Sequence, residues 1–131
     1  MNIGTASDLS GVPPKTIRYY ESIGLIPAVL RAENGYRDYA QDDVETLRFI
    51  NRARRLGFSV KDVGNLLGLW GDRGRSSADV KAVALRHIDE IDERINELNS
   101  IRRTLAHLTD QCHGDDRPEC PILDDLSRKM I

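Results

Sequence analysis

The chain has 131 residues, of which 40% are hydrophobic, 31% charged and 5% aromatic, and its formal net charge is −2. This fits one small globular domain, or one with an extension, and no stretch approaches the ~20 apolar residues that a membrane-spanning helix needs. The N-terminal stretch has neither the basic nor the apolar region of a secretory signal, so we expect a cytoplasmic protein with no membrane partner. Residues 1–62 carry a slight positive charge and the remainder a slight negative one, which places any basic surface in the first half.

The first two predicted elements are short helices joined by a tight turn. The segment SGV at 10–12 interrupts the first helix, and the second begins at the prolines of PPKTIRYYESIG, where a missing N–H costs nothing. Gly24 is placed to end the second helix. Such a pair is a candidate helix-turn-helix. The residues expected to face the core are Ile3, Ala6 and Leu9 in the first helix and Ile17, Tyr20 and Ile23 in the second.

A hairpin is predicted next, because Asn34-Gly35 stands between two extended runs and suits a two-residue turn. We place its strands near 29–31 and 36–38. Helix and hairpin together offer cationic and aromatic side chains that could straddle a DNA groove and its phosphates. Any one of these residues alone could equally belong to a solvated face. The predicted DNA contacts are Lys15, Arg18, Tyr19, Tyr20, Arg31, Tyr36 and Arg37.

Two further helices complete a predicted DNA-binding domain over residues 1–70. In AQDDVETLRFINRARRLG, Asp42 and Asp43 suit the N-terminal dipole, and Gly57 follows the last turn. Ser59 is placed to cap the next helix. The Gly- and Arg-containing segment 71–77 reads as a linker loop.

A single long helix is predicted over 78–111, capped by Ser77, because this segment holds neither Gly nor Pro. Its apolar residues repeat at steps of three, four and seven, which is the spacing of a coiled coil. A homodimer is the favoured explanation, and the alternative is a helix that folds back on its own domain. The predicted dimer seam is Ile88, Ile91, Ile95, Leu98, Leu105 and Leu108, with Ala84 and Ile101 beside it.

The two cysteines of the chain, Cys112 and Cys120, enclose the acidic loop of CHGDDRPEC, and a short helix is expected within the tail that follows. A reducing cytoplasm disfavours a structural disulfide. The loop therefore predicts a site for a ligand that prefers sulfur, with a disulfide or two idle thiols as the alternative. Structural zinc takes four ligands, and His113 adjoins one cysteine too closely to be an obvious third.

The motifs KTIRYYESIGLI, RAENGYRDY and DVETLRFINRARRLGFSVKDV resemble the winged-helix N-terminal domain of the MerR family of transcription regulators, and the likeness extends over the whole chain. RSSADVKA and CHGDDRPECPIL resemble the copper-efflux branch of that family. The resemblance implies a mainly α fold. By this resemblance we expect a winged helix-turn-helix domain, then a dimerisation helix in an antiparallel coiled coil, and then a metal-binding loop and helix over residues 112–131.

The resemblance also implies function. We expect a homodimer on promoter DNA with an inverted repeat, which distorts that DNA for RNA polymerase and so activates copper-efflux genes. Thiolates select soft cations such as Cu(I), so we expect Cys112 and Cys120 to hold one Cu(I), Ag(I) or Au(I) per loop. Divalent-metal sensors of the family carry a cysteine where this chain has Ser77. In an antiparallel dimer Ser77 would lie near the partner's Cys112 and stabilise the anionic site through its helix N-terminus.

Three other functions are alternatives to metal-responsive regulation. A redox switch would keep DNA binding but use the thiols differently, and a cytosolic copper buffer or chaperone would bind no DNA. An enzyme is disfavoured, because the sequence shows no Cys–His nucleophile arrangement and no Gly-rich phosphate loop.

Overall fold

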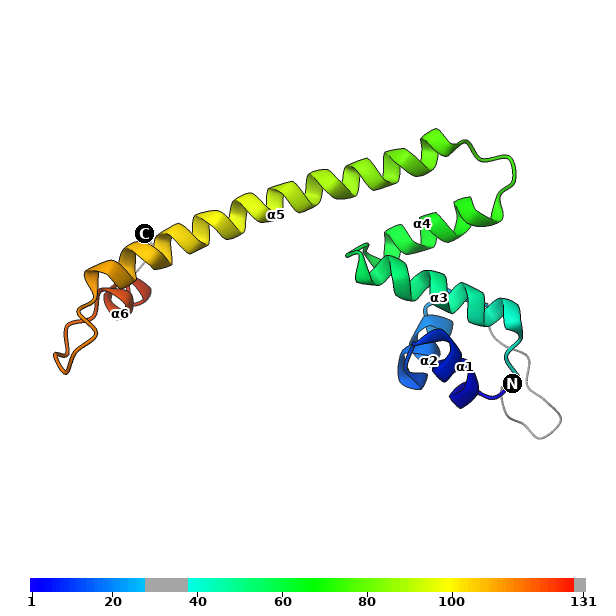
Figure 1. Cartoon of the computed structure of the whole chain (residues 1–131), viewed down its shortest axis with the longest axis horizontal. Helices are drawn as coiled ribbons and strands as arrows, with labels where there is room; N and C mark the ends of the chain where they lie inside the picture. Colours follow the sequence, from blue (N-terminus) through cyan, green and yellow to red (C-terminus); the bar gives the residue numbers. More distant parts are fainter. Residues whose placement is uncertain (28–37, 129–131) are drawn as a thin grey trace. The chain divides into compact units, whose positions relative to one another are not determined.

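The computed structural model describes residues 1–27 and 38–128, and within these ranges the chain is helical without strands (Figure 1). The predicted hairpin falls outside the described residues except for Asp38, which is not in a strand. The mainly α fold is thus confirmed. The helices are α1 (Ile3–Ser10), α2 (Pro14–Ser22), α3 (Gln41–Arg55), α4 (Val60–Gly71), α5 (Ser77–Gln111) and α6 (Pro121–Leu126).

Two compact units divide the chain, Met1–Ala84 and Leu85–Ile131. Because α5 begins in the first unit and ends in the second, the units meet within a continuous helix. The predicted domain boundaries, which start the long helix as a separate element at residue 78, remain predictions. No helix in the described part of the chain is both long and apolar enough to cross a bilayer.

The turn between α1 and α2 follows from its capping residues. The side chain of Asn2 accepts a hydrogen bond from the Thr5 N–H at 2.8 Å and so caps α1. Gly11 ends α1 with φ of 78°, a left-handed conformation that side chains disfavour. Pro14 then opens α2, and Gly24, with φ of 75°, follows its C-cap as predicted.

The core of the first unit forms where α1 packs against α2 and α3, and α3 against α4. It is mainly aliphatic, as the low aromatic content requires. Leu9 and Ile23, which we expected to face inward, are each 43% exposed. The buried apolar residues are Ala6, Val12, Ile17, Tyr20, Ile26, Tyr39, Val44, Leu47, Ile50, Ala53 and Val63.

The N-terminal ends of α3 and α4 are built from the residues that the sequence singled out. Asp42 and Asp43 lie in the first turn of α3, and the Asp43 carboxylate accepts from the Ala40 N–H at 2.8 Å. The Ser59 hydroxyl accepts from the Asp62 N–H at 3.1 Å and caps α4. These caps fix where both helices start and therefore which faces they bury.

The long helix α5 has 35 residues, a length of roughly 52 Å at 1.5 Å per residue. It begins one residue earlier than predicted. The Asp79 N–H lies 3.3 Å from the hydroxyl of Ser76, so Ser76 is the cap and Ser77 the first helical residue. The prediction of Ser77 as the cap was wrong by one position, because two adjacent serines are equally able to cap.

The predicted dimer seam is largely exposed on α5. Ile88, Ile91, Ile95, Leu98 and Leu105 are between 41% and 57% exposed, whereas Leu108 is 8% exposed. Leu108 is therefore already buried within one chain and has little surface left for a partner. The other five leave an apolar face in water, which is costly unless a partner covers it.

Candidate metal site and nucleic-acid interface

The exposed face of α2 carries three of the predicted DNA contacts. Lys15, Arg18 and Tyr19 are exposed, and Ile17 lies on the opposite, buried side. Because helix-turn-helix proteins present the second helix to the major groove, this face is the one that could meet DNA. Arg31, Tyr36 and Arg37 lie outside the described residues.

Tyr20 was predicted both to face the core and to contact DNA, and the structure supports the first role. It is 7% exposed, and its ring centroid lies 6.0 Å from that of Tyr19. Because so little of its surface is exposed, Tyr20 is a core residue beside Tyr19. Tyr19, 52% exposed, is the aromatic side chain that α2 offers to a partner.

Tyr39 positions α2, and sequence reasoning missed it. Its side chain is 1% exposed, and its hydroxyl donates to the Glu21 carboxylate at 2.5 Å. This bond joins the chain entering α3 to the last turn of α2. Arg48 of α3 donates from Nε to the Leu9 carbonyl at 2.9 Å, and this bond joins α3 to α1. The tyrosine in RDYA, just before a helix start, was the available signal.

The sulfur-containing loop begins directly after α5. The Cys112 N–H donates to the Thr109 carbonyl at 3.2 Å, and Gly114 adopts a positive φ of 65° as the chain turns. Asp115 and Arg117 then pair at 2.8 Å, and the same carboxylate accepts from the Arg117 N–H at 2.9 Å. These local bonds fold the loop back toward Cys120.

Cys120 is the N-cap residue of α6, and Pro121 follows it at the first helical position. The backbone N–H of Leu123 holds the pKa of the Cys120 thiol below its ordinary value of 9.0. Partial burial opposes this lowering of the pKa, the Ile122 N–H and the nearby Cys112 side chain support it, and the Asp124 carboxylate opposes it. The start of α6 therefore favours the thiolate, the form that binds metals.

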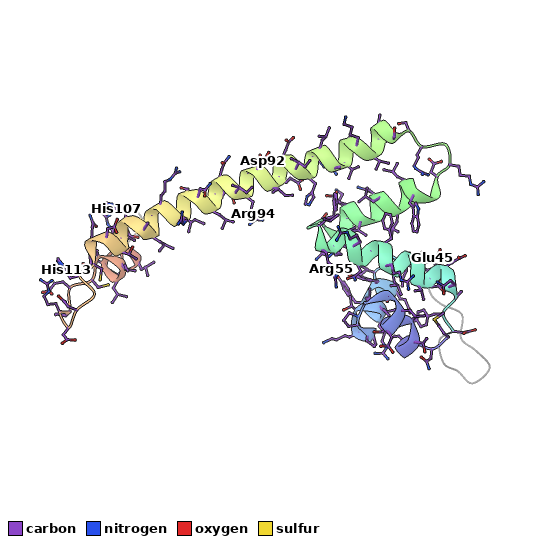
Figure 2. All side chains as sticks on the ribbon, in the orientation of Figure 1. Glu45, Arg55, Asp92, Arg94, His107 and His113 are labelled. Carbon is purple, nitrogen blue, oxygen red and sulfur yellow. The ribbon has the colours of Figure 1, made fainter. Side chains whose placement is uncertain are left out.

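The two cysteines that the sequence singled out are brought together. Both are free and half-buried, and they lie near enough for the Cys112 side chain to help lower the pKa of the Cys120 thiol. His113 is exposed at the start of the loop (Figure 2). Among the described residues, no three His, Cys, Asp or Glu side chains gather as they would to hold a metal ion. The donor set here is a sulfur pair.

Two surface hollows flank the ends of α5. One, of about 730 Å³, lies where α5 begins and is lined by Ser77 and its neighbours. The other, of about 330 Å³, lies between the end of α5 and α6 and includes Leu108. The lining of the first is Arg73, Arg75, Ser77, Val80 and Lys81. Ser77 is exposed, and its predicted role beside a metal site remains a prediction.

A helix-turn-helix module with an exposed cationic and aromatic second helix, joined to a long helix with an open apolar face, defines the class of DNA-binding transcription regulators. The model of the MerR HTH family regulatory proteins matches residues 1–69, and that described as MerR, DNA binding matches residues 44–108. The chain belongs to the MerR family. Regulators of this family act as dimers on promoter DNA.

Individual relatives extend the likeness to nearly the whole chain. Heavy metal-dependent transcription regulator 2 of Rhizobium meliloti is 58% identical, over 97% of this chain and 86% of its own. The transcriptional regulator CueR of Salmonella typhimurium is 43% identical, over 97% of this chain and 92% of its own. The crystal structure of PbrR691 from Ralstonia metallidurans in complex with lead(II) has a TM-score of 0.84 at 30% identity, covering 97% of this chain and 99% of the other.

Proposed function

We propose that this protein is a Cu(I)-responsive transcription activator of copper-efflux and detoxification genes, which also responds to Ag(I) and Au(I). The observation that supports the proposal is a pair of free, half-buried cysteines at the two ends of the loop between α5 and α6. Cys120 has a lowered thiol pKa because α6 begins there. A pair of thiolates suits a soft cation more than a hard one.

The number of donors favours a monovalent ion. The chain has two cysteines, and both lie in this loop. Two thiolates can satisfy a monovalent ion with a filled d shell, which accepts two ligands, whereas zinc prefers four. Asp115 and Asp116 are hard oxygen donors, and Asp115 is already paired with Arg117. We therefore assign one Cu(I) to each loop, held by Cys112 and Cys120.

The relatives support a response to a metal ion, and the choice of ion rests on the donor atoms of the loop. Their names include a heavy metal-dependent regulator and CueR, and the similar solved structure holds lead(II). In the family that the sequence resembles, divalent-metal sensors have a cysteine at the place of Ser77. A serine there removes a sulfur donor, and that supports a monovalent preference.

Metal binding would act on transcription through DNA shape. The exposed face of α2 contacts an inverted-repeat promoter once in each half of the dimer, so the dimer holds two half-sites at a fixed spacing. Ordering of the loop and α6 by the metal shifts the dimer toward a state that bends and untwists the promoter. Contacts between the protein and the DNA offset the free energy of deforming the promoter, and RNA polymerase can then transcribe from the deformed promoter.

The test is transcription in vitro from an inverted-repeat promoter under reducing conditions, with Cu(I), Ag(I), Zn(II), Pb(II) and Hg(II) compared. The proposal expects induction by the two monovalent ions. It also expects that Cys112→Ser and Cys120→Ser abolish induction while leaving promoter binding within about twofold, since neither thiol lies in the unit that holds α2. Induction by zinc or lead alone would overturn the metal assignment.

A further inference from the structure

The helix that carries the predicted DNA contacts, α2, packs chiefly against α1, and α1 packs in turn against α3. Two residues of α3 lie at the turn between α1 and α2. Arg48 donates from Nε to the Leu9 carbonyl, and a Cβ atom added at Gly11 would lie 3.2 Å from Nδ2 of Asn51. The end of the helix pair at which the turn lies is therefore fixed to α3.

The opposite ends of the two helices, the start of α1 and the end of α2, are both bonded to Tyr39. The Tyr39 N–H donates to the Met1 carbonyl at 2.7 Å, and the Tyr39 carbonyl accepts from the Met1 nitrogen at 2.7 Å. Met1 lies two residues before α1, and Glu21, whose carboxylate accepts from the Tyr39 hydroxyl at 2.5 Å, lies in the last turn of α2. One residue thus connects the two helix ends that the turn leaves apart.

The bond from Tyr39 to Glu21 restrains the direction of α2 because both of its ends are held. The Tyr39 side chain is 1% exposed, so core packing keeps its ring in place. The N–H groups of Leu25 and Ile26 donate to the Tyr20 carbonyl at 3.0 and 3.4 Å, which closes the chain over the last turn of α2. A hydrogen bond to a carboxylate is among the stronger kinds. A tilt of α2 must therefore stretch a strong hydrogen bond or displace a packed ring.

The exposed side chains of α2 lie between these two anchors. Lys15, Arg18 and Tyr19 come after the turn and before Glu21. Hydrogen bonds to base edges tolerate a range of only about 0.5 Å between donor and acceptor. Attraction to phosphates acts over longer distances and carries no sequence information. A small tilt of α2 therefore weakens base contacts first and leaves the general attraction to DNA.

We propose that Tyr39 is a positioning residue for promoter recognition, because its hydroxyl sets the angle of α2 and so the sequence discrimination of the protein. Being buried, Tyr39 acts through α2 and not by touching DNA. The inference rests on the proposed function in one respect, that α2 is the helix that contacts the promoter. It adds that a residue outside the helix-turn-helix determines how well that helix distinguishes one DNA sequence from another.

Fluorescence anisotropy of the full-length, metal-free protein with two DNA duplexes tests this role. One duplex is the sequence that the unchanged protein selects most strongly from a random pool, and the other is a shuffled sequence of the same length and composition. Tyr39→Phe keeps the buried ring and both backbone bonds to Met1 and removes the hydroxyl. The ratio of the two dissociation constants should fall about tenfold, the discrimination that one good base contact supplies. The affinity for the shuffled duplex should change by less than about twofold.

Ile50→Val is the control for stability. Ile50 is fully buried in α3, and loss of one methylene there should destabilise the fold about as much as loss of one hydrogen bond. Urea denaturation checks that Ile50→Val and Tyr39→Phe are destabilised alike. Ile50→Val should leave the ratio of the two dissociation constants unchanged, because it removes no bond to α2.

Glu21→Gln and Glu21→Leu are a matched pair at the other end of the bond. Both remove the charge, and only Glu21→Gln keeps an oxygen that accepts from the Tyr39 hydroxyl. Glu21→Gln should keep the ratio near that of the unchanged protein, and Glu21→Leu should lower it about tenfold. The double variant Tyr39→Phe with Glu21→Leu should be no worse than either alone, since both remove the same bond. Equal ratios for Glu21→Gln and Glu21→Leu would contradict the bond as the cause.

A ratio in Tyr39→Phe within about twofold of the unchanged value, or an equal fall in Ile50→Val, would overturn the positioning role. Because the measurement uses no metal, it is independent of the Cu(I) assignment. If Tyr39→Phe keeps the ratio and Cu(I) still activates transcription, the proposed function stands and only the positioning role fails. If Tyr39→Phe lowers the ratio but Cu(I) does not activate the unchanged protein, the positioning role stands and the metal assignment fails.

Discussion

Truncation of Ile91 tests whether the open face of α5 is a dimer interface. Ile91 is 41% exposed in the single chain, so about half of its burial remains to be gained from a partner. Full burial of an isoleucine side chain is worth about 1.5–3 kcal/mol, which leaves roughly 0.7–1.5 kcal/mol for each copy. A symmetric dimer contains the residue twice, so Ile91→Ala should weaken dimerisation by about 1.5–3 kcal/mol.

That loss corresponds to a dissociation constant raised by about 10- to 150-fold, since 1.4 kcal/mol is a factor of ten. Sedimentation equilibrium of the DNA-free protein measures it directly. Glu93→Ala is the matched control, because Glu93 lies on the opposite side of α5 and should change the constant by less than about twofold. An Ile91→Ala protein that dimerises as tightly as the unchanged one would refute the role given to this face.

Three further predictions concern stability and the thiols. Ile50 is fully buried in the first unit, so Ile50→Ala should lower the free energy of unfolding by about 2–5 kcal/mol in urea denaturation. Ser76→Ala should cost about 1 kcal/mol by removing the α5 cap, and Ser77→Ala much less; the reverse order would restore the original cap prediction. In a Cys112→Ser protein, alkylation of Cys120 by iodoacetamide should have its midpoint at a lower pH when folded than in urea. The reason is that the pKa of the Cys120 thiol is lower in the folded protein than in the unfolded one. The thiolate therefore stabilises the fold above the unfolded thiol pKa, and this stabilisation is lost as pH falls through the folded pKa. Coincident alkylation midpoints in the folded protein and in urea would contradict the prediction.

The helix limits could be predicted because local chemistry sets them. Gly24 and Gly57 follow the ends of α2 and α3, and Ser59 caps α4, as the sequence indicated. Each of these signals acts over three or four residues and needs no knowledge of the rest of the fold. The one-residue error at the start of α5 arose where Ser76 and Ser77 offered the same local chemistry.

Features that depend on distant residues could not be predicted. The bond from Tyr39 to Glu21 joins positions 18 apart, and neither residue shows in the sequence which partner it will have. Leu9 and Ile23 follow the apolar period of their helices, but each is 43% exposed although Val12 and Ile26, close by in the chain, are buried. Periodicity predicts which way a side chain points, but it does not predict how much of that side chain other residues bury.

At the proposed metal site, the roles of Cys112 and Cys120 stay a prediction, and sequence reasoning missed one feature of Cys120. Two cysteines in a loop with Gly114 indicated a turn that brings the thiols near one another, and the Cys112 side chain does contribute to the lowered pKa of the Cys120 thiol. The lowering of the Cys120 thiol pKa by backbone N–H groups of α6 was missed. Pro121 was the available signal, because a proline that opens a helix makes the residue before it the N-cap.

The most direct measurement of the central proposal is X-ray absorption at the copper edge, on reduced protein loaded with one Cu(I) per chain. The account predicts that the copper ion has two sulfur neighbours and no nitrogen or oxygen neighbour. Replacing Cys112 or Cys120 by serine should abolish this two-sulfur signal. A shell containing nitrogen, oxygen or a third sulfur would contradict the two-cysteine Cu(I) site.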